Sequence, residues 1–169
     1  MAQIQAVHGK RIVYLFRPLS LEKEQAATRL AYTKENEKSM SKDADVTATK
    51  DGPLRSPGEA EIEITATSVL AKGDKMIPAL QSAMLNNELV EIWEANLDEP
   101  VETANKFKGT YYQGYITEQT LSSPSDDWVE VSQTFGINGT GATGEVTIPQ
   151  EQLDEAMYVF KDTTKVATE

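Results

Sequence analysis

Few residues in this chain of 169 could carry out covalent chemistry. There is no cysteine and His8 is the only histidine, which excludes thiolate catalysis and cysteine-based zinc sites. A histidine acts as a general base only beside a positioned nucleophile, and His8 stands in an N-terminal segment next to Gly9. Two carboxylates could hydrolyse a glycosidic bond, but among 27 acidic residues some pair can always be chosen. We therefore predict that the chain is not an enzyme.

A glycine-rich run at residues 139–144 matches the pattern G-x-G-x-x-G of dinucleotide-binding loops. Such a loop must open a helix, because the N-terminal N–H groups and the helix dipole bind the pyrophosphate. Residues 145–149 read as a strand, and Asn138-Gly139 is typical of a two-residue hairpin turn. We expect a hairpin connection here and no cofactor.

Two groups of acidic residues could offer oxygen ligands to calcium: Asp43 with Asp45, and Asp126 and Asp127 with Glu130. Neither group has the spacing of a calcium-binding loop with its glycine and distal glutamate. We interpret both groups as solvated loop residues and expect no metal site.

Charge and hydropathy limit the partners of the chain. It has 16 Lys and Arg against 27 Asp and Glu, a net charge of −11, whereas binding of DNA or RNA requires a basic surface. No window approaches the roughly 18 consecutive apolar residues of a membrane-spanning helix. The N-terminus lacks the basic segment and apolar run of a signal peptide, so we expect a cytoplasmic product that does not associate with membranes.

Most of the chain reads as strands separated by Pro, Gly and Asp. Residues 10–16 are apolar on both faces, which predicts a buried strand, and residues 61–67 alternate between charged and apolar side chains, which predicts a strand with one wet face. Further strands are expected at 89–95, 109–116, 128–135 and 145–148. Their aromatic residues, Trp93 and Trp128 among them, are expected to fill the core or to pair across strands.

One amphipathic helix is predicted at about residues 75–86, because Ile77, Leu80 and Met84 recur at helical spacing. Residues 20–38 are ambiguous: their propensity favours a helix, although Leu30 and Tyr32 also fit a strand. Residues 39–58 are polar and end in Gly-Pro and Ser-Pro-Gly, which predicts a long excursion from the core.

These elements predict a mainly β fold, an antiparallel β-sandwich or barrel of about seven strands with one flanking α-helix. The length suits one domain, which we place at residues 1–150, with residues 151–169 as a peripheral C-terminal tail.

Eight short stretches occur in a characteristic order. They are TKDG (49–52), GEAE (58–61), SVL (68–70), GD (73–74), VEIWE (90–94), KFKGTYYQGYI (106–116), WVE (128–130) and SQTF (132–135). In order, spacing and total length they resemble the major tail, or tail tube, proteins of long-tailed, non-contractile bacteriophages, particularly the lactococcal-type siphophage family. The resemblance covers residues 10–150.

This resemblance implies β-sandwich subunits that join edge to edge into hexameric rings, which stack as the tail tube through which DNA is ejected into the host. It also implies extended strands from Leu30 to Thr49 and a long arm at about 36–58, in place of a helix there. Further implied partners are the tape measure protein, the tail terminator and the distal tail protein, while DNA passes through the lumen without specific binding. The protein would be made in the cytoplasm of the host bacterium and end up in the virion tail.

The polar excursion is the expected contact between subunits or rings, and we expect it to become ordered when it meets a neighbour. The candidate contact residues are Lys42, Asp43, Asp45, Lys50, Asp51, Gly52, Pro53 and Leu54. Six copies at −11 would carry −66 in a ring, and acids facing the lumen would keep DNA from adhering. The alternative is an accessory or receptor-binding β-sandwich module of the virion that forms a discrete oligomer.

Overall fold

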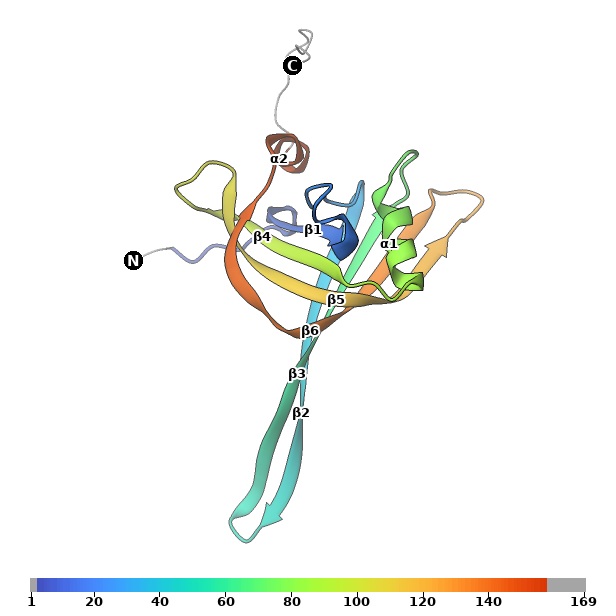
Figure 1. Ribbon diagram of the computed structural model, residues 1–169. Coiled ribbons are helices and arrows are strands. Elements are labelled where there is room, and N and C mark those ends of the chain that lie inside the picture. Colours follow the sequence, from blue (N-terminus) through green and yellow to red (C-terminus); the bar gives the residue numbers. More distant parts are fainter. Residues whose placement is uncertain (1–2, 158–169) are drawn as a thin grey trace.

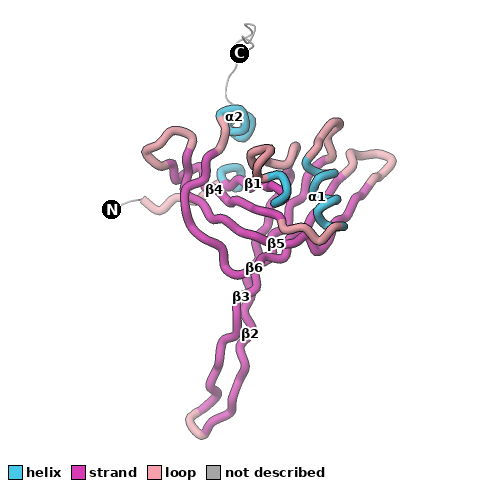
Figure 2. The backbone as a smooth tube through the Cα atoms, viewed as in Figure 1, coloured by secondary structure: helices cyan, strands magenta, loops and turns pink. Residues whose placement is uncertain are grey.

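Six antiparallel strands form most of the computed structural model, which describes residues 3–157 (Figure 1). They are β1 (Ile12–Pro18), β2 (Thr33–Thr49), β3 (Gly52–Val69), β4 (Val90–Pro100), β5 (Lys106–Ser122) and β6 (Glu130–Thr147). All six belong to one sheet with the order β1-β4-β5-β6-β3-β2. The predicted mainly β, antiparallel class is confirmed, and the strands curve continuously around one side of the molecule (Figure 2).

Helix α1 (Met76–Leu85) confirms the predicted amphipathic helix. Asp74 accepts a hydrogen bond from the backbone N–H of Met76 at 2.8 Å and so caps the first turn. Ile77 and Leu80 are buried beneath the helix, whereas Leu85 at its end is exposed. Two 3₁₀ turns, η1 (Gly9–Arg11) and η2 (Leu19–Leu21), and the helix α2 (Gln150–Met157) complete the described elements.

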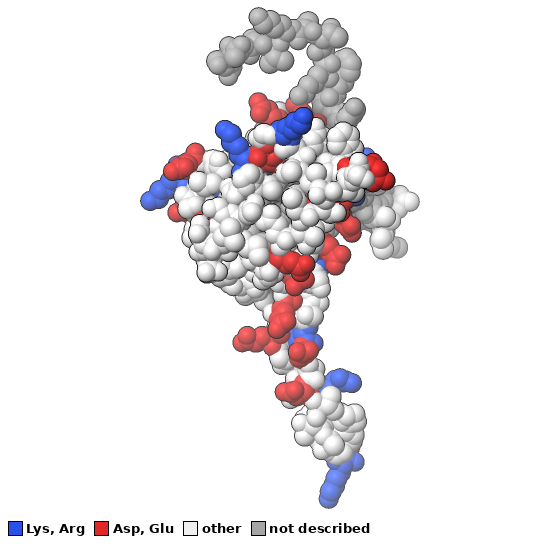
Figure 3. Space-filling model, turned by 90° about the vertical axis from the view of Figure 1, so that its right-hand side faces the viewer, with Lys and Arg blue, Asp and Glu red and all other residues white. Residues whose placement is uncertain are grey.

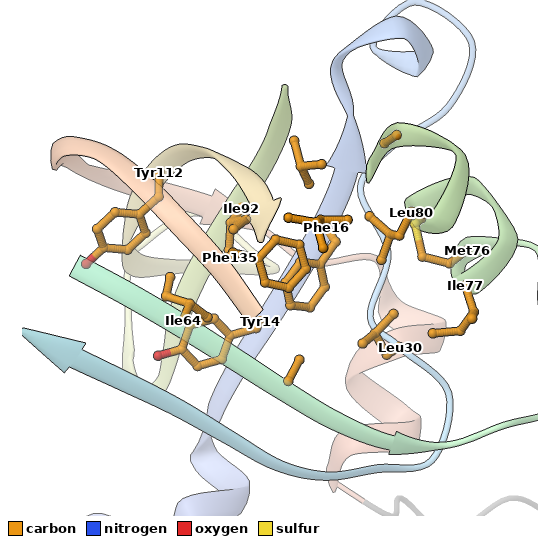
Figure 4. Close-up of a cluster of buried hydrophobic side chains, with 14 of the residues drawn as sticks. Tyr14, Phe16, Leu30, Ile64, Met76, Ile77, Leu80, Ile92, Tyr112 and Phe135 are labelled. Carbon is orange, nitrogen blue, oxygen red and sulfur yellow. The ribbon is translucent and has the colours of Figure 1, made fainter. Parts of the chain in front are cut away.

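Strand β1 is buried on both of its faces, as the sequence predicted. Tyr14 and Phe16 join the larger apolar cluster, in which the ring of Phe16 stacks on that of Phe135 at 5.0 Å beneath α1 (Figure 4). Val13 and Leu15 point to the other side of the sheet and pack in a second cluster. The β1 end of the sheet is therefore covered on both faces.

The helix that propensity favours within residues 20–38 is wrong. Only the three-residue η2 forms there, and β2 begins at Thr33. The guanidinium of Arg17 donates to the carbonyl of Gln25, and the backbone of Thr28 pairs with that of Phe16 in both directions at 2.9 and 3.2 Å. These contacts and the burial of Leu30 outweigh a local preference worth only tenths of a kcal/mol per residue. The extended conformation implied by the tail-protein resemblance is confirmed from Thr33 onward.

The hairpin turn predicted at Asn138-Gly139 is also wrong, because β6 continues from Glu130 to Thr147 as one strand. Its partner β5 pairs Gln113 with Asn138 and Tyr111 with Ala142, so three residues of β6 bulge opposite one residue of β5. Gly139 and Gly141 adopt φ angles of 68° and 80° inside this bulge. The glycines thus bend a strand instead of ending it.

Two further expectations concern the borders of the sheet. Trp128 was expected on a strand, but it lies just before β6 and is 77% exposed. In the expected C-terminal tail, Leu153 of α2 is buried in the second apolar cluster, so we propose that the domain extends at least to this residue. Residues 158–169 of that tail lie outside the described residues.

Candidate assembly surfaces

A two-stranded ribbon projects from the sheet (Figure 1). β3 pairs with β6 only from Glu63 to Val69, so residues 40–62 of β2 and β3 pair with each other alone. We call residues 40–62 the ribbon. The nine steps from Met40 to Thr49 extend roughly 30 Å at about 3.3 Å each, which is about the diameter of a small domain. The ribbon is therefore long enough to run along a neighbouring subunit.

All eight candidate contact residues lie in this ribbon. Lys50 and Asp51 form its turn, where Gly52 adopts a φ of 113°. Asp43 lies at a bulge, and a Cβ placed on Gly58 would come 3.1 Å from its carbonyl oxygen. The expected arm is thus a regular β-ribbon, and whether these residues contact another subunit stays a prediction.

The two faces of the distal ribbon differ in polarity, because residues paired across an antiparallel ladder share a face. One face carries the pairs Ala44–Pro57, Val46–Arg55 and Ala48–Pro53. We call it the apolar ribbon face. The other carries Asp45–Ser56, Thr47–Leu54 and Thr49–Gly52. Five of six residues are apolar on the first face and only Leu54 on the second, although nearly all are exposed. Figure 3 shows basic and acidic side chains along the projecting ribbon.

The side of the sheet away from α1 is polar over β2, β3, β5 and β6. Alternation along the strands places on it a series of Ser and Thr residues, with hydroxyl contacts of 3.5 Å between Thr65 and Thr134 and 3.4 Å between Thr67 and Ser132. The acids of this side, which we call the acidic sheet face, include Glu35, Glu37, Glu61, Glu63 and Glu118. Lys34 stands at its border and pairs with Glu130 at 2.6 Å.

A polar network ties the root of the ribbon to β1 and β4. Lys38 of β2 donates to Glu94 of β4 at 2.9 Å, and the hydroxyl of Tyr14 donates to the other oxygen of Glu94. Burial and then this hydrogen bond raise the pKa of Tyr14 above its ordinary value. For Lys38, burial opposes the charge, but Glu94 offsets it and raises the pKa. The network therefore holds Lys38 charged and fixes the base of the ribbon.

A second network lies on the opposite face of β4. Arg17 pairs with the buried carboxylate of Glu91 at 2.9 Å, and its guanidinium lies 5.0 Å from the ring centre of Trp93. The hydroxyl of Tyr111 donates to Glu91 at 2.8 Å, and burial raises the pKa of this tyrosine. Sequence reasoning missed both networks, because their partners lie 20 or more residues apart.

Among the residues first considered for chemistry, His8 has a structural role. His8 accepts a hydrogen bond from the N–H of Lys10 and caps η1. Within residues 3–157, no group of three His, Asp or Glu side chains is placed to hold a metal ion. The glycine run of β6 is followed by strand, not by a helix, so its resemblance to a nucleotide loop is confined to the sequence. None of the described helices is both long and apolar enough to cross a membrane.

Unpaired strand edges are the remaining feature with a role in binding. β2 is the last strand of the sheet, and within the described residues its outer edge has no partner. β6 leaves β3 after Gly136, so residues 137–147 have a second free edge. Pro53 and Pro57 have no backbone N–H group. The outer edge of β3 in the ribbon therefore offers two fewer hydrogen-bond donors to another chain. Free edges of this kind are templates for pairing with another chain.

A curved antiparallel sheet with free strand edges and an exposed ribbon offers surfaces for assembly with other chains. The family model described as phage tail tube protein matches residues 6–142, so the chain belongs to the phage tail tube protein family. It is a structural protein of the tail tube and a component of the virion, as the sequence resemblance predicted.

Individual relatives agree with this family. A protein of Staphylococcus phage phiMR25, provisionally named a tail protein, is 29% identical over 144 residues, which are 82% of this chain and 75% of the relative. The SPP1 tail tube structure is similar with a TM-score of 0.71 at 17% identity, covering 97% of this chain and 92% of that one. The tail of a gene transfer agent particle, refined with C6 symmetry, gives 0.64 at 13% identity, covering 82% and 99%.

Proposed function

We propose that this protein forms hexameric rings that stack into the tail tube and conduct DNA during ejection, without any enzymatic activity. The observation that carries the proposal is the ribbon, a roughly 30 Å projection whose two strands pair only with each other among residues 3–157. The family and the C6 symmetry of a structural relative support the six-fold ring.

Ring closure uses the free strand edges in this proposal. The outer edge of β2 in one subunit pairs with the 137–147 edge of β6 in the next, so that the sheet continues around the ring. Because the two edges differ, the contact is heterologous and closes only after a full rotation. Closure hides edges that would otherwise promote aggregation.

The acidic sheet face lines the lumen in this arrangement. Its glutamates repel the phosphates of DNA and keep the passage free of adhesion. The ribbons make the contacts between successive rings, and the tape measure protein, tail terminator and distal tail protein are the further partners.

The test replaces residues 42–60 with Asn-Gly. Ser41 and Glu61 lie directly opposite each other, so a two-residue hairpin can join them. We expect a folded protein, judged by circular dichroism and thermal unfolding, that forms rings but no tubes by negative-stain electron microscopy. Unimpaired tubes would refute the role of the ribbon. A wild-type protein that remains a small oligomer at high concentration would favour the accessory virion module.

A further inference from the structure

Four large apolar side chains are exposed together at one end of the sheet. They are Tyr32, Leu70, Leu121 and Trp128, with exposed fractions of 72, 39, 57 and 77%. We call them the apolar end patch. Single exposed apolar residues need no explanation, but a cluster of this kind marks an interaction site.

Backbone contacts hold the segments of this patch side by side. The N–H of Val69 donates to the carbonyl of Tyr32 at 3.0 Å, and that of Leu70 donates to Val129, next to Trp128, at 2.9 Å. Leu121 pairs with Val131 in the adjoining ladder. A hollow of about 390 Å³ adjoins these segments, between residues 28–31 and 71–75. The four residues therefore lie on neighbouring segments, with a recess beside them.

The apolar end patch and the ribbon lie at opposite ends of β3. Leu54 near the ribbon tip and Leu70 in the patch are sixteen residue steps apart, which is roughly 50 Å along an extended strand. Figure 1 shows the ribbon pointing away from the loops that join β3 to α1 and β5 to β6. Each subunit thus carries two different apolar surfaces, one at each end of β3.

We infer that the apolar ribbon face of one copy docks on the apolar end patch of a second copy in the next ring. This inference rests on the proposed tube and names the surface that receives the ribbon. Val46 and the two prolines supply the apolar contact, with Trp128 as the anchor, since buried tryptophans dominate binding energy at interfaces.

Charge complementarity favours a second copy as the occupant. Arg55 is the charged residue of the apolar ribbon face. Asp126 and Asp127 directly precede Trp128 in the loop before β6. Oppositely charged groups around an apolar centre set the register of a contact and its rate of formation. The contact joins two unlike surfaces, so it repeats without closing and forms an open stack.

The test uses two pairs of matched variants. Val46→Asp alters the apolar ribbon face, and Thr47→Asp places the same charge on the opposite face. Trp128→Asp alters the patch, and Leu85→Asp alters another exposed apolar residue, at the end of α1. Val46→Asp and Trp128→Asp should form rings but raise the concentration needed for stacking roughly tenfold or more. The two controls should form tubes as the wild type does, by electron microscopy and sedimentation.

Mixing gives the sharper result. Rings of Val46→Asp keep a sound patch, and rings of Trp128→Asp keep sound ribbons, so one joint can form between them and no further joint can follow. We expect ring pairs from the mixture and single rings from either variant alone. In a Trp93→Phe background, the emission of Trp128 should also shift to shorter wavelength on stacking.

The outcomes separate the two proposals. Wild-type tubes together with normal tubes of Trp128→Asp or of Val46→Asp would overturn this inference and leave the tube intact. Long tubes from the mixed rings would overturn it as well. A wild type that forms neither rings nor tubes would overturn the proposed function and this inference with it.

Discussion

Two glutamates on opposite faces of β4 organise the polar contacts inside the sheet. Glu94 binds Lys38 and Tyr14 on one face, and Glu91 binds Arg17 and Tyr111 on the other. Each carboxylate therefore has a cation and a phenol as partners, which is the condition for burying a charge at acceptable cost. These contacts tie β1, β2 and β5 to β4.

Tyr14 predicts how stability depends on alkaline pH. Because its pKa is raised in the folded state, the unfolded chain loses this proton first, near pH 10, and stability falls as the pH rises further. Tyr14→Phe removes this loss, so the unfolding free energy should fall less steeply between about pH 9.5 and 11.5. Lys38 and Tyr111 have raised pKa values too, so part of the slope should remain.

Urea denaturation at a series of pH values measures this slope. Tyr115→Phe is the matched control, since Tyr115 is 43% exposed, and it should keep the wild-type slope. An unchanged slope in Tyr14→Phe would contradict the role assigned to the buried phenol.

Individual residues show where sequence reasoning reaches its limit. The burial of Val13 to Phe16 follows from a run of apolar residues and was predicted correctly. The partners of Glu91 and Glu94 could not be predicted, because polar side chains of the same types occur throughout the chain and only the strand register selects among them. Trp128 was misplaced because a tryptophan beside a strand is more often buried than exposed.

At the scale of elements, the close approach of β4, β5 and β6 depends on a residue without a side chain. A Cβ on Gly109 of β5 would lie 2.2 Å from the carbonyl oxygen of Glu94 and 2.6 Å from a methyl group of Val146. Gly109→Ala should therefore lower the free energy of unfolding by about 1–3 kcal/mol, since the backbone must shift.

Its partner in the ladder provides the control. Gly144 lies opposite Gly109, and a Cβ there would meet no atom within 4 Å. Gly144→Ala should change stability by less than about 0.5 kcal/mol in chemical denaturation. If the two substitutions change the free energy of unfolding equally, the structure around Gly109 can adjust to a methyl group and the prediction is contradicted.

The elements predicted correctly from residues alone are those with a strong local pattern. Residues 61–67 alternate strictly, and α1 repeats its apolar side chains at helical spacing. Residues 40–62 are mostly polar, so local pattern indicated only an excursion, and the extended arm came from the family resemblance. The errors at residues 20–38 and at Asn138-Gly139 share one cause: tertiary pairing decided what a helix-favouring or turn-favouring sequence became.

At the scale of the whole molecule, charge is distributed unequally between surfaces. Lys38, Lys42 and Arg55 of β2 and β3 lie on the side that continues from the core, while acids occupy the side opposite. When the acidic sheet faces of several subunits surround one lumen, the excess of acidic residues therefore produces a negative electrostatic potential inside it.

Reversing charge on the acidic sheet face should make assembled tubes retain DNA. The double substitution Glu61→Lys and Glu63→Lys exchanges repulsion for phosphate binding inside the lumen. Short duplex DNA should sediment with these tubes at about 50 mM salt and be released as salt rises, whereas wild-type tubes should not bind it.

A variant with the same change in charge elsewhere controls for net charge. Glu22→Lys with Glu24→Lys alters two exposed acids near η2, away from the acidic sheet face. These tubes should leave short duplex DNA in the supernatant. Equal retention by both double variants would place the acidic sheet face outside the lumen.

The placement of ribbon and apolar end patch at opposite ends of β3 gives any stack of these subunits a direction. In the proposed tube, one terminal ring displays six ribbons and the other displays six patches. The two ends must therefore grow at different rates and be stopped by differently shaped proteins. The protein at the ribbon end offers a recess that receives the ribbons, and the protein at the other end covers the apolar end patches. Since every joint between them is the same, the subunit itself cannot count rings, and the length of the polymer has to be measured by another molecule.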